Sequence, residues 1–161
     1  MSELLKSVGT IELPATGESF KVSELFKKDV SDNARVKIWG VGGNFLSWFG
    51  DMVVASDSGS VVSYSALTRN AYDRDIIAAL GGEAKCEITL AEMWQLMLLQ
   101  RTGGDGVLLK HGYANVFYVR DSAAVLRAVS VYWRDFGWYV DARELGYDRW
   151  SFGRRVFVRN S

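Results

Sequence analysis

The sequence predicts a single α+β domain, in which short N-terminal strands and a central pair of helices precede a C-terminal antiparallel β-meander. Three observations support this fold class. The 161 residues are 48% hydrophobic and 24% charged, a composition typical of one globular domain with a buried core. Strand-like alternation opens and closes the chain, whereas helical spacing is confined to its middle. Neither a repeat nor a linker divides the sequence, so we expect one domain over residues 1–161.

The N-terminal third reads as short strands separated by turns. Residues 8–13 and 20–26 are amphipathic segments on either side of a turn that contains the single proline. Residues 34–39 alternate polar and apolar side chains, which predicts a strand that ends at the glycines of residues 40–43. A further strand is expected at residues 61–65.

Two helices are predicted in the middle of the chain. The first covers Asp73–Leu80 and ends at Gly81–Gly82, because glycine readily adopts the left-handed conformation of a C-cap. The second follows Thr89 and Glu92, whose spacing is that of a capping box, and runs from Leu90 to about Arg101. We expect its apolar stripe to face the core: Leu90, Met93, Trp94 and Met97.

Residues 107–161 are predicted to form the β-meander. Its strands are expected at residues 107–109, 115–120, 125–134, 138–143 and 155–159. The fourth strand alternates cleanly, with Trp138, Val140 and Ala142 on a core face and Tyr139, Asp141 and Arg143 on the other. Neighbouring strands are expected to extend this polar row with four side chains: Tyr132, Arg134, Arg155 and Arg159.

Charge is balanced over the whole chain but divided along it. With 19 basic and 19 acidic residues, the simplest argument for a nucleic-acid-binding protein is missing. Residues 111–161 nevertheless carry 8 Arg, no Lys and 5 acidic residues, together with three Trp, five Tyr and four Phe. Arg, Trp and Tyr dominate the energetics of interfaces. The alternative is an aromatic-rich β core with a solvated rim of arginines.

The residues required for catalysis or metal binding are scarce. Cys86 and His111, the single cysteine and the single histidine, could meet as nucleophile and base, although an incidental thiol and a surface imidazole are more common. Two such residues cannot supply the four ligands of a structural zinc site. The glycines of residues 40–43 lack the third glycine of a dinucleotide fingerprint, which would fall at Phe45. We therefore expect neither a cofactor nor a metal ion.

No apolar run approaches the roughly 20 residues of a membrane span. The first residues also lack the apolar region of a secretory signal. The sequence therefore predicts a cytoplasmic protein.

From about Trp39 to the C-terminus, the chain resembles a group of short uncharacterised proteins from candidate-phyla bacteria of the Patescibacteria or Parcubacteria type. The ending Trp150-x-x-Gly153-x-x-Val-Phe157-x-Arg-Asn160 is shared, except that Val158 stands where the group often has Ser. The other shared segments are residues 47–49, 76–83, 88–100, 105–109, 113–121 and 126–129.

In that group the region after the strand containing Leu126–Val129 varies strongly, while Trp and Gly positions persist. This pattern is similar to the variable region of target proteins of diversity-generating retroelements, in which surface residues are diversified on a fixed, often C-type-lectin-like scaffold. Such a scaffold is what the resemblance implies here, although the chain has one cysteine and no clear two-helix start. Adenine-directed changes of Asn codons would suit six positions: Tyr139, Asp141, Tyr147, Asp148, Ser151 and Phe152.

The leading hypothesis is a non-enzymatic recognition protein for a protein or other macromolecular ligand. The expected scaffold residues are Trp133, Gly137, Trp138, Gly146, Trp150, Gly153, Val156 and Val158. The expected contact residues are Tyr132, Arg134, Asp135, Phe136, Tyr139, Asp141, Arg143, Tyr147, Asp148, Arg149, Ser151, Phe152, Arg154 and Arg155. The alternative is a single-stranded nucleic-acid-binding module that uses aromatic stacking and Arg–phosphate contacts, which the zero net charge disfavours.

Overall fold

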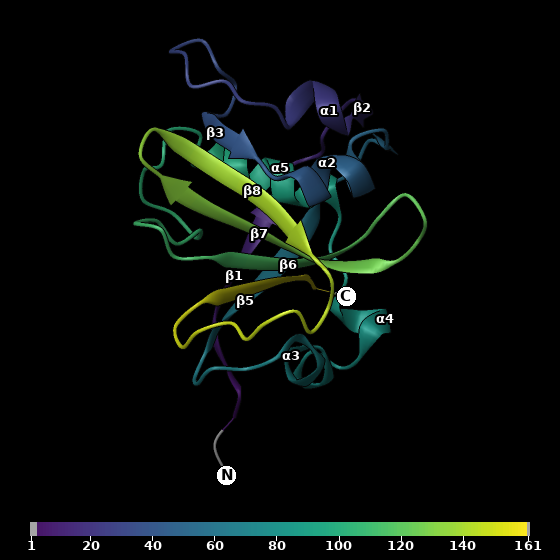
Figure 1. Cartoon of the computed structure of the whole chain (residues 1–161), viewed down its shortest axis with the longest axis vertical. Coiled ribbons are helices and arrows are strands. Elements are labelled where there is room, and N and C mark those ends of the chain that lie inside the picture. Colours follow the sequence, from purple (N-terminus) through teal and green to yellow (C-terminus); the bar gives the residue numbers. More distant parts are fainter. Residues whose placement is uncertain (1–2, 161) are drawn as a thin grey trace.

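A computed structural model describes residues 3–160 and places seven strands in one mixed sheet, in the order β1-β5-β9-β6-β7-β8-β3 (Figure 1). The α+β fold class is therefore confirmed. Two neighbouring pairs are parallel, β3 with β8 and β6 with β9, and the other pairs are antiparallel. The strands are β1 (Leu5–Leu13), β3 (Ile38–Val41), β5 (Ser60–Leu67), β6 (Asn115–Arg120), β7 (Leu126–Arg134), β8 (Gly137–Arg143) and β9 (Arg155–Arg159).

Within the part of the chain that the structure describes, five helices and a small second sheet complete the fold. The helices are α1 (Val22–Leu25), α2 (Gly43–Phe49), α3 (Asp73–Ala79), α4 (Glu83–Cys86) and α5 (Leu90–Leu99). The second sheet pairs β2 (Phe20–Lys21) with β4 (Val53–Val54). Figure 1 shows α1, α2 and α5 together at one end of the molecule and α3 and α4 at the other. None of the helices within residues 3–160 is long and apolar enough to cross a bilayer.

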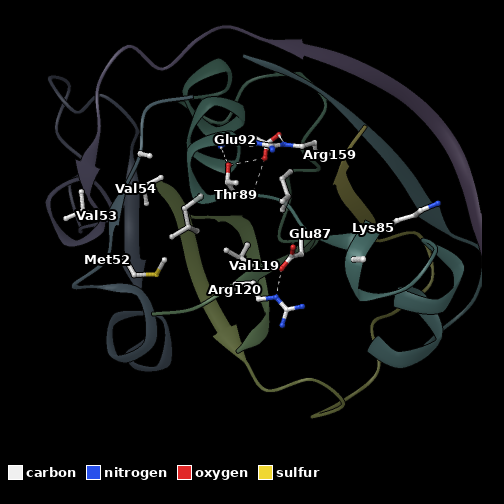
Figure 2. A pocket seen from close by; sticks show the side chains of 14 residues that line it. Met52, Val53, Val54, Lys85, Glu87, Thr89, Glu92, Val119, Arg120 and Arg159 are labelled. Atoms are coloured by element: carbon white, nitrogen blue, oxygen red, sulfur yellow. Dashed lines mark hydrogen bonds and ion pairs between the residues drawn. The ribbon is translucent and has the colours of Figure 1, made fainter. Parts of the chain in front are cut away.

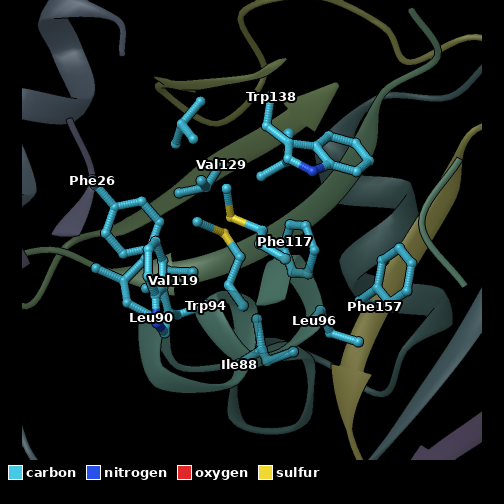
Figure 3. Packing of buried hydrophobic residues seen from close by; sticks show 14 of the residues in the cluster. Phe26, Ile88, Leu90, Trp94, Leu96, Phe117, Val119, Val129, Trp138 and Phe157 are labelled. Carbon is cyan, nitrogen blue, oxygen red and sulfur yellow. The ribbon is translucent and has the colours of Figure 1, made fainter. Parts of the chain in front are cut away.

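The sheet has a hydrophobic cluster on each face, and β6 contributes to both. Phe117 and Val119 join the larger cluster under α5, which Figure 3 shows in section with Trp94 and Trp138. The intervening side chains of β6, including Tyr118, join the smaller cluster beneath α3 and α4. Strand alternation therefore gives β6 two buried faces, as expected for a central strand.

Helix α5 forms where the sequence predicts it. Thr89 and Glu92 make both hydrogen bonds of the capping box, and the predicted core residues Met93, Trp94 and Met97 are buried. The helix ends at Leu99, slightly before the expected Arg101. Helix α3 likewise starts at the expected Asp73 and ends at Ala79, one residue before the expected Leu80; Gly81 and Gly82 follow with φ of 104° and 101°.

Several N-terminal predictions were wrong in detail. The strand expected over residues 20–26 is β2 followed by the helix α1. The strand expected at residues 34–39 starts only at Ile38. It continues past the expected end to Val41, because Gly40 and Val41 pair in parallel with Tyr139 and Val140 of β8. Residues 107–109 are not a strand, because the side chains of Gln100 and Asn115 accept the hydrogen bonds of backbone N–H groups in this segment.

The meander is confirmed for β6, β7 and β8, but β9 does not follow it. Strand β9 lies on the far side of β6 and runs parallel to it, with Phe157 in register with Phe117. This register turns Phe157 toward α5 and takes Arg155 and Arg159 to the same face. The prediction that these two arginines extend the polar row of β8 was therefore wrong. Arg155 instead donates to the carbonyl of Val107.

Candidate binding surface

The exposed face of β7 and β8 follows the predicted alternation. Trp138 and Val140 are fully buried, whereas Tyr139, Asp141 and Arg143 on the opposite side of β8 are partly exposed. Cross-strand register places residues of β7 on the same side: half-buried Tyr132 lies opposite Tyr139, and buried Ser130 lies opposite Asp141. We call this surface the display face: Ser130, Tyr132 and Arg134 of β7, and Tyr139, Asp141 and Arg143 of β8.

An aromatic row crosses the display face from β3 to β7. The ring centroids of Trp39 and Tyr139 are 5.8 Å apart, and those of Tyr139 and Tyr132 are 5.3 Å apart. The guanidinium of Arg134 lies 5.1 Å from the Trp39 ring. Trp39 was not among the predicted contact residues. The alternation of residues 34–39 places it opposite Val36 and Ile38, but it does not specify that this strand pairs with β8.

Two glycines allow this arrangement: Gly40 in β3 and Gly42 directly after it. A Cβ on Gly40 would lie 2.8 Å from the Tyr139 ring, and one on Gly42 would lie 2.2 Å from the Asp141 Oδ1. The side chains of β8 therefore lie directly against the β3 backbone, where any larger residue would displace them. Packing against the display face thus explains Gly40 and Gly42 of the glycine-rich segment.

The segment between β8 and β9, residues 144–154, is held by a buried carboxylate; we call it the anchored loop. The Oδ1 of Asp73 accepts hydrogen bonds from the Trp150 indole at 2.7 Å and the Tyr118 hydroxyl at 2.8 Å. Its Oδ2 accepts from the Gly146 backbone N–H at 2.8 Å. Because Asp73 is fully buried, these three donors compensate for the loss of hydration.

Backbone hydrogen bonds hold the same loop along its length. Trp150 exchanges two of them with Ala71, at 2.8 and 3.0 Å. The Phe152 N–H donates to the side-chain oxygen of Asn70 at 2.8 Å, and the Gly153 N–H donates to the carbonyl of Leu67 at 2.9 Å. The backbone of the anchored loop is thus fixed at both ends and near its middle.

The side chains of this loop point into solvent between the anchors. Tyr147 is 77% exposed and Phe152 is 65% exposed, although Trp150 between them is buried. Asp148, Arg149 and Ser151 are also exposed. At the β7–β8 turn, Asp135 is exposed in the left-handed conformation and Phe136 is 71% exposed.

Most predicted scaffold residues are buried or half-buried. Trp138, Trp150, Val156 and Gly137 are buried, whereas Trp133, Gly153 and Val158 are half-buried. Gly146 is exposed, with a φ of 79° that favours glycine. Of the predicted contact residues, only Arg155 lies on the wrong face of the sheet; it packs 5.4 Å from the Tyr64 ring.

A hollow of about 290 Å³ separates the display face from the anchored loop. Burial raises the pKa of Tyr132, and Tyr139 and the negative charge of Asp141 act in the same direction, so the Tyr132 hydroxyl stays protonated. The lining residues are Gly112, Ala114, Ser130, Tyr132, Asp141, Ala142, Arg143, Trp150 and Arg154.

A second pocket of about 470 Å³ lies between β4 and the segment that leads into α5 (Figure 2). Four of its five charged side chains are paired with one another: Arg120 pairs with Glu87, and Arg159 donates to Glu92 at 3.0 Å. The pocket thus combines apolar side chains with charged groups that mostly have partners already. Sequence analysis missed it because its lining comes from separate segments: residues 52–55, 84–92, 119–120 and 159.

The two residues considered for nucleophilic catalysis do not form an evident site. Cys86 is fully buried, and this burial, with the charge of Glu87, raises the pKa of its thiol to about 11. A thiol with this pKa is protonated near neutral pH and is a poor nucleophile. His111 is exposed. Among residues 3–160, no three His, Cys, Asp or Glu side chains are grouped so that they could hold a metal ion.

Comparisons with known proteins add no functional assignment. The chain matches no family model, no curated protein and no solved structure. The lectin-like character of the fold stays a prediction. The geometry of the display face and of the anchored loop is therefore the basis for the functional proposal.

Proposed function

We propose that this protein is a non-enzymatic recognition protein that binds a protein partner through the display face and the anchored loop. One observation carries the proposal: strongly exposed aromatic side chains stand on a loop whose backbone is fixed by buried anchors. Tyr147 and Phe152 flank the buried Trp150, and the indole of Trp150 is hydrogen-bonded to Asp73. The loop thus separates residues that hold it from residues that can make contacts.

This separation suits binding for an energetic reason. Ordering a flexible loop on association opposes binding, whereas a fixed loop loses little entropy. Tyr and Phe offer large contact areas and have only two side-chain torsions to fix. Exposed Phe136 at the β7–β8 turn provides a further aromatic contact of the same kind.

A single-stranded nucleic acid is the second candidate partner. The aromatic row of Trp39, Tyr139 and Tyr132 offers faces on which bases could stack, with Arg134 beside it. Asp141 on the same face opposes this reading, because a carboxylate repels a phosphate backbone. A protein partner is therefore preferred.

We also propose that the anchored loop is a diversified region, as the resemblance implies. Four of the six positions that suit adenine-directed change are exposed on this loop: Tyr147, Asp148, Ser151 and Phe152. The expected genomic observation is a near-copy of the 3′ end of the gene that differs mainly at adenines, beside a reverse transcriptase gene. A 3′ end without such a copy in a complete genome sequence would contradict this proposal.

The test of the binding function is a comparison of two sets of substitutions. What we call the display variant replaces the three strongly exposed aromatics beside the display face: Phe136→Ser at the β7–β8 turn, and Tyr147→Ser and Phe152→Ser on the anchored loop. The control variant combines Val53→Ser and Leu99→Ser, which are also exposed but lie on other elements. Partners captured by the wild-type protein would be identified, purified and titrated by calorimetry against both variants. A 20-nucleotide single-stranded DNA would be titrated in parallel.

We expect the display variant to lose about 2 kcal/mol or more of binding free energy, as interface aromatics often do. Both variants should keep a free energy of unfolding within about 1 kcal/mol of wild type, because the replaced side chains are exposed. Equal losses of affinity in the two variants would contradict the proposal. Tight binding of the DNA without a protein partner would favour the second candidate.

A further inference from the structure

Two arginines line the hollow beside the display face, and each packs against an aromatic ring. The guanidinium carbon of Arg143 lies 3.5 Å from the centroid of the Trp150 ring. That of Arg154 lies 4.7 Å from the centroid of the Tyr113 ring. Both arginines line the same hollow. Stacking on an aromatic ring limits the motion of a guanidinium and leaves its edge free for hydrogen bonds.

Neither of these arginines is neutralised by a carboxylate within the described part of the chain. Arg143 donates from Nη2 to the carbonyl of Asp148 at 3.1 Å, and Arg154 donates from Nη1 to the carbonyl of Phe152 at 3.4 Å. The Nε of Arg143 is buried and has no hydrogen-bond acceptor among residues 3–160. Such a donor is costly to leave unpaired.

Two other arginines of the sheet are paired with carboxylates instead. Arg127 donates to Asp121 at 2.8 Å, and Arg159 forms ion pairs with Asp57 and Glu92, each at 3.0 Å. Arg143 differs from these two because its buried Nε lacks an acceptor among residues 3–160 and its side chain lines a hollow.

The remaining charge in the hollow limits what it can accept. Asp141 is the carboxylate among the lining residues, and its Oδ1 accepts from the Ala142 N–H and lies against the backbone of Gly42. Two guanidinium groups and one carboxylate give the lining a formal net charge of +1. The hydroxyls of Ser130 and Tyr132 add neutral hydrogen-bonding groups to the lining.

We propose that this hollow binds the carboxylate of an acidic side chain presented by the protein partner, with Arg143 and Arg154 as its donors. The inference rests on the proposed binding function and names the chemistry of the group recognised. A planar carboxylate matches the fork of a guanidinium, and its single charge matches the net charge of the hollow. A phosphate dianion would bring a second negative charge close to Asp141.

The hollow can be tested with small probes and without the partner. The probe is N-acetyl-glutamate amide, which carries one side-chain carboxylate; its neutral control is N-acetyl-glutamine amide, and inorganic phosphate is the competing anion. Each is titrated at constant ionic strength, with the side-chain Nε–Hε resonances of Arg143 and Arg154 observed by NMR. We expect a saturable shift with the glutamate probe, no shift with the glutamine probe, and weaker binding of phosphate.

Three substitutions locate the site. Arg143→Lys keeps the charge but loses the planar fork, and Arg154→Gln removes the second guanidinium; each should weaken the glutamate probe about tenfold, the loss expected for one charge-assisted hydrogen bond. Arg149→Gln is the matched control, because Arg149 is an exposed arginine of the same anchored loop. It should bind the probe as the wild type does. If Arg143→Lys disturbs the loop in its NMR spectrum, Arg154→Gln decides alone.

The possible failures are distinguishable. Shifts that do not saturate, that also occur with the glutamine probe, or that survive Arg154→Gln overturn the carboxylate site. Tighter binding of phosphate than of the glutamate probe also overturns it. A display variant that loses the partner while the wild type ignores the probe leaves the binding function intact and removes only this inference. A saturable probe with a partner insensitive to the display variant removes the binding function instead.

Discussion

Asp73 is the residue on which the geometry of the anchored loop most depends. It lies at the start of α3 and receives hydrogen bonds from Tyr118 of β6 and from Gly146 and Trp150 of the loop. One carboxylate with two acceptor oxygens satisfies all three donors, whereas an amide of the same shape has only one acceptor oxygen. Both carboxylate oxygens of Asp73 are therefore needed to accept these three hydrogen bonds.

Asp73→Asn should therefore release the loop. We expect a loss of about 2–3 kcal/mol in unfolding free energy, because hydrogen bonds to a charged group are replaced by at least one donor–donor contact. Hydrogen exchange of the Gly146 amide and the Trp150 indole should become faster. Asp75→Asn is the matched control on the same helix, where the side chain is exposed, and it should change neither measurement. Unchanged exchange in Asp73→Asn would show that the loop is held without this carboxylate.

Trp94 provides a second test at the level of one residue. It is 4% exposed, and its ring lies 5.2 Å from that of Phe26 in an edge-on contact. Trp94→Ala should cost about 3–5 kcal/mol in denaturant unfolding, the usual loss for a buried aromatic side chain. Leu99→Ala on the same helix is the control, because Leu99 is exposed. Similar losses for both variants would mean that α5 contributes to stability in another way than through this core contact.

Among the elements, those governed by local signals could be predicted from the sequence. The capping box of Thr89 fixes the start of α5, and the alternation of Trp138 to Arg143 fixes the faces of β8. These signals involve neighbours a few residues apart. The face of the candidate site was therefore predictable, together with the exposed residues of the anchored loop.

Long-range pairing was not predictable in the same way. Strand β9 has the predicted boundaries, but its position beside β6 depends on the match of Val156 and Phe157 with residues some 40 positions earlier in the chain. No local pattern specifies which strand a central apolar strand joins. The same holds for Trp39, which joins the display face only because β3 pairs with β8.

The contact between β3 and β8 gives a prediction at this scale. Gly40→Ala places a methyl group 2.8 Å from the Tyr139 ring, so we expect a displaced ring and a loss of about 1–3 kcal/mol, as for other overpacked sites. Gly43→Ala is the control, because a Cβ at this helical position meets nothing within 4 Å. It should be neutral or stabilising by up to about 1 kcal/mol. NMR shifts of Tyr139 that stay unchanged in Gly40→Ala would contradict the close packing of these strands.

Glu92 links elements from across the whole molecule. Its carboxylate caps α5 through Thr89 and accepts hydrogen bonds from Ser60 of β5 at 2.6 Å and Arg159 of β9 at 3.0 Å. Burial on its own would raise the pKa of Glu92, but the hydrogen bonds from Arg159, Ser60 and Thr89 outweigh it and hold this pKa below its ordinary value of 4.5. The folded protein therefore favours the ionised form of Glu92 more than the unfolded chain does.

The sign of this shift predicts how stability depends on pH. Because the pKa is depressed on folding, the stabilisation by Glu92 is fully present above 4.5 and is lost as the pH falls through the lower pKa of the folded state. Glu92→Gln should thus be less stable than the wild type by about 2–3 kcal/mol near neutral pH, since it loses charged hydrogen bonds. The difference between the two proteins should shrink once the pH falls below 4.5, because the wild-type carboxylate then also becomes neutral. Urea unfolding of both proteins over a series of pH values measures this difference directly. A difference that stays constant or grows on acidification would mean that the charge of Glu92 does not hold α5, β5 and β9 together.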